Sequence, residues 1–143
     1  MNLAELTIAL HSNTLFPIRK IARDYSISSA QLLCLVSIPS EGINQTNLAS
    51  FLSIDLSTLS RNLKHLINKN FITKQRIQSD NRSYHIVLTD DGVSLCKKVY
   101  EDLESYFHDI HLLLNDQEIE QTLSTLSQFN WMLFKKKLDN AHL

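Results

Sequence analysis

A chain of 143 residues with a formal net charge of −1 is long enough for one compact domain with an appended helical region. Only two glycines and two prolines occur, which disfavours a fold with many tight turns and favours a mainly helical chain. The two cysteines are too few for a disulfide framework, the N-terminus has no signal-peptide pattern, and no apolar run approaches the ~18 residues of a membrane span. We therefore expect a cytoplasmic protein that does not enter a membrane.

The charge is unevenly distributed along the chain. Residues 56–89 hold six basic residues and one acidic residue, whereas residues 90–143 hold five basic and ten acidic residues. A net charge of +5 in the middle of a nearly neutral protein indicates a local surface for an anionic partner such as nucleic acid. For this segment taken alone, a solvated charged face is the alternative.

The first part of the chain is predicted to be helical. Apolar residues at roughly helical spacing over residues 3–25 predict a first helix, which we expect to kink or break near Pro17 because proline lacks a backbone donor. A second helix is predicted over residues 29–38, since Ser28 and Gln31 form a capping-box pattern.

The predicted elements that follow have the order of a winged helix-turn-helix. They are two short helices at residues 45–51 and 56–69, capped by Asn44 and Asp55, two strands at residues 71–77 and 84–88, and two long helices opening at Thr89 and Asn115. The predicted fold class is mainly α with a small two- or three-stranded antiparallel sheet. We assign the winged helix-turn-helix to residues 28–89 and a helical dimerisation region to residues 1–27 and 90–143.

The helix predicted after Asp55 separates an apolar face from a polar face. Its apolar face carries, at spacings of three and four, Leu56, Leu59, Leu63 and Leu66. This spacing predicts that the apolar face docks on the preceding helix and that the polar face points outward. Hydroxyl and basic side chains can bind phosphate oxygens and base edges in a major groove, and residues 56–79 contain no carboxylate to repel DNA. The predicted DNA contacts of this helix are Ser57, Thr58, Ser60, Arg61, Lys64 and His65.

The predicted hairpin adds Arg76 on its first strand and Arg82 near its tip. A guanidinium on a protruding hairpin can enter a minor groove, where A·T tracts concentrate negative potential. Asp80 can pair with a nearby arginine and fix the shape of the tip, although an incidental turn pair with Arg82 is the alternative. Because the hairpin follows a basic amphipathic helix, we interpret it as a wing, with Arg76, Asp80 and Arg82 as site residues.

Several local motifs coincide along the chain. They are the helix-turn-helix segment at residues 47–66, an Asp-x-Arg pattern at Asp80 and Arg82, and a Leu-Thr-x-x-Gly pattern at Leu88, Thr89 and Gly92. Together they resemble the MarR family of winged helix-turn-helix transcriptional regulators, and the resemblance extends over nearly the whole chain. Asn70 departs from the family's usual glycine, but asparagine is the next-best residue for a left-handed turn.

The resemblance implies a homodimer that binds a pseudo-palindromic operator in double-stranded DNA, usually as a repressor that responds to a small aromatic or phenolic effector. It also implies that the first helix and the last two helices form the dimer. No catalytic or nucleotide-binding motif occurs, so we expect neither an enzyme nor a cofactor. A winged helix that serves only as a protein-interaction module is the alternative, which the basic polar face disfavours.

A redox-responsive or metal-responsive regulator is a further alternative within the family. Cys34 and Cys96 lie among apolar residues, where a thiol is expected to be inert. The spacing of Glu104, His108 and His111 places three candidate metal ligands on one helical face. A solvated acidic face is the favoured interpretation of that spacing, so we expect no metal site.

Overall fold

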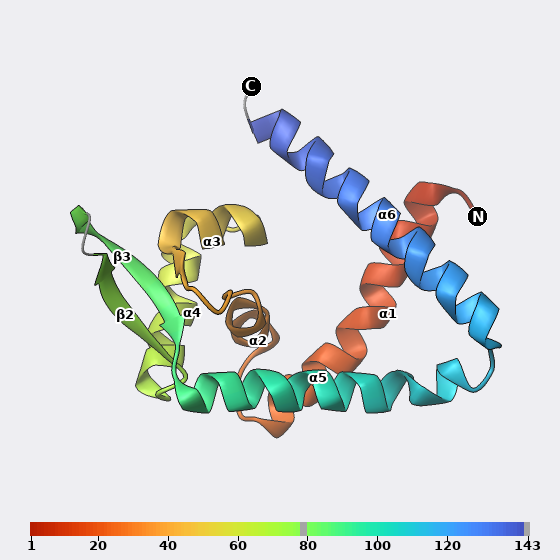
Figure 1. Ribbon diagram of the computed structural model, residues 1–143, viewed down its shortest axis with the longest axis horizontal. Coiled ribbons are helices and arrows are strands. Elements are labelled where there is room, and N and C mark those ends of the chain that lie inside the picture. The colour runs from red at the N-terminus through yellow and green to blue at the C-terminus, as the bar shows by residue number, and fades with distance from the viewer. Residues whose placement is uncertain (78–79, 142–143) are drawn as a thin grey trace. The chain divides into compact units, whose positions relative to one another are not determined.

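The computed structural model describes residues 1–77 and 80–141, with the backbone alone at residues 77, 80–83 and 141 (Figure 1). Its elements follow the predicted order, with one short strand added between the second and third helices. The helices of this described part are α1 (Leu3–Asp24), α2 (Ser29–Val36), α3 (Gln45–Leu52), α4 (Leu56–Asn68), α5 (Asp90–His111) and α6 (Asp116–Ala141). Its strands are β1 (Ile43–Asn44), β2 (Ile72–Ile77) and β3 (Asp80–Leu88). The fold is therefore mainly α with a small antiparallel sheet, as predicted.

The packing divides the chain into two units, Met1–Glu104 and Ser105–Leu143. The first unit contains α1 to α4, the sheet and most of α5, and the second contains the end of α5 and all of α6. Within the described residues, no helix combines the length and the apolar character that crossing a membrane requires.

Side-chain caps determine where several helices begin. Ser28 accepts a hydrogen bond from the Gln31 backbone at 3.1 Å, and the Gln31 side chain accepts one in return at 3.0 Å, which completes the predicted capping box of α2. Asn44 caps α3 and Asp55 caps α4, as predicted. Each cap satisfies a backbone donor that the helix itself leaves unpaired.

The first helix runs through Pro17 without interruption, so of the predicted kink or break the break is wrong. A proline inside a helix removes one hydrogen bond and costs about 3 kcal/mol. Pro17 itself is buried, and so are Ile21 and Ala22 in the turn that follows. Burial of this face in the core offsets the lost hydrogen bond and keeps the helix continuous.

The sheet has the order β1-β3-β2, with β3 pairing antiparallel to both neighbours. Ile43 of β1 lies opposite Ile86 of β3, which is fully buried. The turn before β1 depends on Gly42, which has a φ of +82° and donates to the Pro39 carbonyl at 2.9 Å. A Cβ there would lie 2.5 Å from the Val87 side chain, so the turn requires glycine.

The core of the first unit is formed by buried residues of α1 to α5 and of the sheet. Its most deeply buried side chains include Leu35, Leu48, Leu59, Leu66 and Ile86. The apolar face of α4 belongs to this core except at Leu56, which is 49% exposed, so that part of the predicted face is wrong. At 100° per residue Leu56 lies only about 20° around the helix from the buried Leu63, so its direction does not set it apart; it differs in being the first residue of α4.

Candidate nucleic-acid interface

The polar face of α4 lies in solvent because the opposite face is held in the core by Leu59, Leu63 and Leu66. Five of the six residues predicted to contact DNA on this helix are exposed, and the sixth, Thr58, is partly exposed. The exposed residues are Ser57, Ser60, Arg61, Lys64 and His65. Basic side chains and hydroxyl groups therefore share one accessible face.

The Asp55 carboxylate organises the first turn of α4. It accepts hydrogen bonds from the Thr58 backbone at 2.8 Å, from the Thr58 hydroxyl at 2.7 Å and from the Ser57 hydroxyl. These hydrogen bonds hold the pKa of Asp55 well below its usual range and keep the carboxylate ionised. The bond from Ser57 has the largest effect. Since both hydroxyls donate to Asp55, their oxygens are left to accept hydrogen bonds from other groups.

Further side-chain contacts orient the polar face. The guanidinium of Arg61 donates to Thr58 Oγ1 at 3.4 Å, one turn earlier on the same helix. Gln45 of α3 donates from Nε2 to the Ser60 hydroxyl, so Ser60 links the two helices of the helix-turn-helix. Sequence reasoning missed Gln45, which lies in the first turn of α3 and is partly exposed beside this face. Its signal is an amide side chain directly after the N-cap Asn44.

The tight turn between α3 and α4 depends on one left-handed residue. Ser53 has a φ of +57°, and Ile54 donates to the Ala49 carbonyl at 3.1 Å across the turn. This geometry turns the chain within a few residues, so that α3 packs directly against α4.

Arg76 lies on the hairpin with Tyr84 directly opposite on β3. Its Nε donates to the Tyr84 hydroxyl at 3.2 Å, and its guanidinium carbon lies 5.7 Å from the centre of the ring. The hydrogen bond and the cation–π contact hold this cation on the surface of the hairpin. The side chains of Asp80 and Arg82 lie outside the described residues, while their backbone forms the start of β3, which begins earlier than the predicted Tyr84.

The two cysteines lie outside the helix-turn-helix and the hairpin. Burial raises the pKa of the Cys34 thiol to about 11, and it also raises the pKa of Cys96, whose thiol donates to the Leu35 carbonyl at 3.8 Å. Both are free thiols that stay protonated at neutral pH and are therefore poor nucleophiles.

Metal-ligating side chains do not gather into a site in the described part of the chain. No group of three or more His, Cys, Asp or Glu side chains there, Glu104, His108 and His111 among them, is arranged to hold a metal ion.

Comparison with known proteins gives consistent results. The family model of the SarA/Rot transcriptional regulators matches residues 17–99, more than half of the chain. The chain is 27% identical over 103 residues to the HTH-type transcriptional regulator PecS of Dickeya dadantii, an alignment that covers 69% of this chain and 62% of PecS. The chain thus spans less than two thirds of that relative.

Two solved structures share the fold. A MarR transcriptional regulator from Methanosarcina mazei Go1 superposes with a TM-score of 0.75 at 27% identity, covering 92% of this chain and 96% of that one. A mutant of E. coli MarR, complexed with operator DNA, superposes with a TM-score of 0.69 at 22% identity, covering 89% and 92%. The chain therefore belongs to the SarA/Rot family of transcriptional regulators and has the winged helix-turn-helix fold of the MarR proteins.

Proposed function

We propose that the protein binds double-stranded DNA sequence-specifically, as a homodimer on a pseudo-palindromic operator, and thereby represses transcription. The observation that carries the proposal is the exposed face of α4, which presents Arg61 and Lys64 to solvent without a carboxylate between residues 56 and 79. The face fits a major groove because its basic groups can donate to phosphate oxygens and base edges, while the Ser57 and Thr58 hydroxyl oxygens can accept from donors on base edges. The hairpin with Arg76 fits the role of a wing on the adjacent minor groove, and Asp80 and Arg82 belong to the same proposed surface.

The second unit supports the homodimer. None of its residues 105–140, whose side chains the structure describes, is buried, although α6 is rich in large apolar side chains. The exposed ones on α6 are Leu123, Leu126, Trp131, Met132, Leu133, Phe134 and Leu138. Apolar surface of this extent favours association with a second copy of the chain. We assign α1, α5 and α6 to the dimer and residues 28–89 to DNA binding.

The proposal also covers the molecule to which the regulator responds and its place in the cell. A cytoplasmic repressor that releases DNA on binding a small aromatic or phenolic effector matches the MarR resemblance. The raised pKa of both thiols makes a cysteine-based redox response the weaker candidate.

The test begins with a duplex selected by the protein from a random library. Fluorescence anisotropy at several salt concentrations gives the affinity for this duplex. A plot of log affinity against log salt concentration should have a negative slope of several units, because DNA phosphates that bind the protein release counterions. Arg61→Ala should lower the preference for the selected duplex over random DNA by about 5- to 150-fold, which corresponds to the ~1–3 kcal/mol of a specific base contact. Arg82→Ala should weaken binding to both duplexes about equally.

Lys97→Ala is the matched control, because Lys97 is an exposed cation on α5, outside α4 and the hairpin, whose Nζ lies 3.8 Å from Glu101 Oε1. It should leave both affinities unchanged. Equal binding of all duplexes by the unaltered protein would overturn the proposed function. If Lys97→Ala and Arg61→Ala lowered the preference for the selected duplex equally, the assignment of α4 to the DNA contact surface would be wrong.

A further inference from the structure

The C-terminal end of α4 is fastened to the first turn of α5 by side chains. Asn70 Nδ2 donates to Asp91 Oδ2 at 3.0 Å. Thr89 Oγ1 donates to the Asn70 carbonyl at 2.6 Å and accepts from the Gly92 backbone at 3.1 Å. Three residues thus connect the end of one helix to the start of another that lies about twenty positions further along the chain (Figure 1).

The backbones at this junction also approach closely. The Thr89 amide donates to the Phe71 carbonyl at 3.1 Å. A Cβ on Gly92 would lie 2.0 Å from the same carbonyl oxygen, a distance that no side chain can occupy. Gly92 therefore allows the start of α5 to rest directly on the chain that leaves α4.

The side chain of Asn70 does more than tolerate its backbone conformation. Its φ of +60° lies in the left-handed region, where glycine is the residue with the least strain. Glycine would satisfy the turn but could not bond to Asp91. The amide is thus an added contact between α4 and α5 that the turn itself does not require.

We propose that Asn70, Thr89 and Asp91 form a clasp that positions the recognition helix α4 relative to α5 and so sets the half-site spacing that a dimer accepts on DNA. The proposal rests on the proposed function, since it takes α4 as the recognition helix and α5 as part of the dimer. Helix α4 has 13 residues and is therefore about 20 Å long. A tilt of about 10° at the clasp moves its far end by about 3 Å, close to the ~3.4 Å rise of one base pair.

The clasp is tested by breaking the Asn70–Asp91 hydrogen bond and restoring it with the roles exchanged. Asn70→Gly removes the amide but suits the left-handed turn, and Asn70→Asp places a second carboxylate beside Asp91. Adding Asp91→Asn to Asn70→Asp recreates the bond with donor and acceptor reversed. Asp90→Asn is the matched control, because it removes a charge from the same turn of α5 without touching the clasp.

The measurement is the affinity of each variant for duplexes whose two half-sites are moved apart or together by one base pair. The unaltered protein should prefer its selected spacing, and both single Asn70 variants should lower that preference by about tenfold. The double variant, Asn70→Asp with Asp91→Asn, should regain most of the preference for the selected spacing. The control Asp90→Asn should keep the full preference. A positioning role thus predicts a change in the ratio between spacings.

A clasp that only stabilised the fold would lower the affinity for every spacing equally, and that result would overturn the proposal. The proposal would also be overturned if the double variant showed no stronger preference for the selected spacing than Asn70→Asp. A second readout does not depend on DNA. The distance distribution between spin-labelled non-natural residues at positions 64 and 97 should be narrow in the unaltered protein and broad in Asn70→Gly. If no duplex is bound, the proposed function fails, while an unchanged distribution would still overturn the clasp.

Discussion

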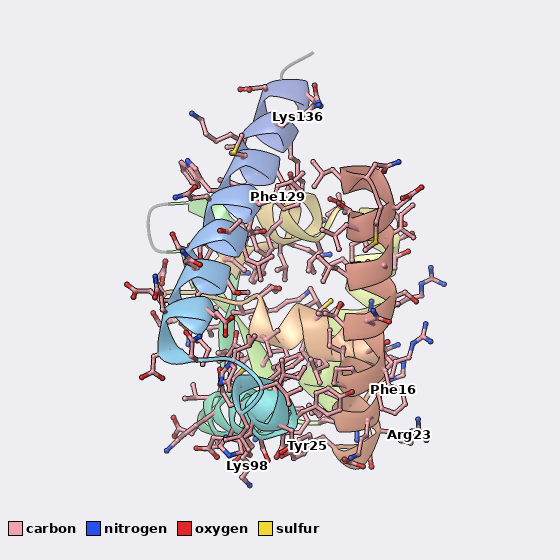
Figure 2. All side chains as sticks on the ribbon, turned by 90° about the vertical axis from the view of Figure 1, so that its right-hand side faces the viewer. Phe16, Arg23, Tyr25, Lys98, Phe129 and Lys136 are labelled. Carbon is pink, nitrogen blue, oxygen red and sulfur yellow. The ribbon has the colours of Figure 1, made fainter. Side chains whose placement is uncertain are left out.

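At the residue scale, one hydrogen bond joins the end of α1 to α5. The Tyr25 hydroxyl donates to Asp102 Oδ2 at 2.7 Å, with Tyr25 at the C-cap of α1 (Figure 2). This bond, together with partial burial and the charge of Asp102, raises the pKa of Tyr25 to about 12. Ionisation would place a phenolate against a carboxylate, so the folded protein holds the phenol proton more tightly than the unfolded chain does.

The bond predicts a loss of stability at high pH. The contribution of Tyr25 is fully present below the unfolded pKa of about 10 and is lost as pH rises through the folded value of about 12. Urea unfolding between pH 9 and 12 should therefore show a smaller decline in Tyr25→Phe than in the unaltered protein. Tyr100→Phe, at an exposed tyrosine of α5, is the control and should keep the full decline. An identical pH profile in Tyr25→Phe would contradict the prediction.

At the element scale, α4 has a buried apolar face and an exposed polar face that we propose binds DNA. Leu63 is 1% exposed in the middle of the helix, whereas Leu56 is 49% exposed in its first turn. The burial of this helix in the core therefore depends on the leucines that follow Leu56. Its first turn is organised instead by Asp55, which leaves the residues around Ser57 accessible.

This difference gives a matched pair of substitutions. Leu63→Ala should lower the free energy of unfolding by about 2–5 kcal/mol, because it removes buried apolar volume and leaves a cavity. Leu56→Ala should change it by no more than about 0.5 kcal/mol, as is usual for an exposed position. Chemical denaturation followed by circular dichroism measures both. A large loss in Leu56→Ala would mean that its side chain is covered, for instance in a dimer.

At the scale of the whole molecule, the proposed dimer depends on the apolar side chains of α6. Leu126 is 46% exposed, and Gln128 lies two residues further along the same helix. Leu126→Glu places a charge in the proposed interface once for each copy, so the dissociation constant of the dimer should rise on the order of tenfold or more. Gln128→Glu adds the same charge as a control and should have a smaller effect. Sedimentation equilibrium over a range of concentrations measures both.

The outcome that would contradict this prediction is a monomer in the unaltered protein at concentrations where it binds its duplex. Equal dissociation in Leu126→Glu and Gln128→Glu would also contradict it, since the effect would then follow the added charge and not the lost apolar contact.

Local patterns in the sequence were enough to predict the order of the elements and most of their starts. The caps at Ser28, Asn44 and Asp55 each act within three residues, so their chemistry can be read from the chain alone. The left-handed turn at Asn70 was likewise predictable, because few residues adopt that conformation. The outward direction of Arg61 followed from the period of the helix and the leucines opposite it.

Only the tertiary structure decided the features that join distant parts of the chain. The break expected at Pro17 does not occur because the helix face around it is buried, and Leu56, the first residue of α4, is exposed although its spacing places it with the buried leucines. The contacts from Gln45 to Ser60, from Asn70 to Asp91 and from Tyr25 to Asp102 join residues 15, 21 and 77 positions apart. Periodicity predicts which face of a helix is buried, but which two polar side chains meet depends on how distant elements pack together, and that pairing leaves no signal in a single sequence.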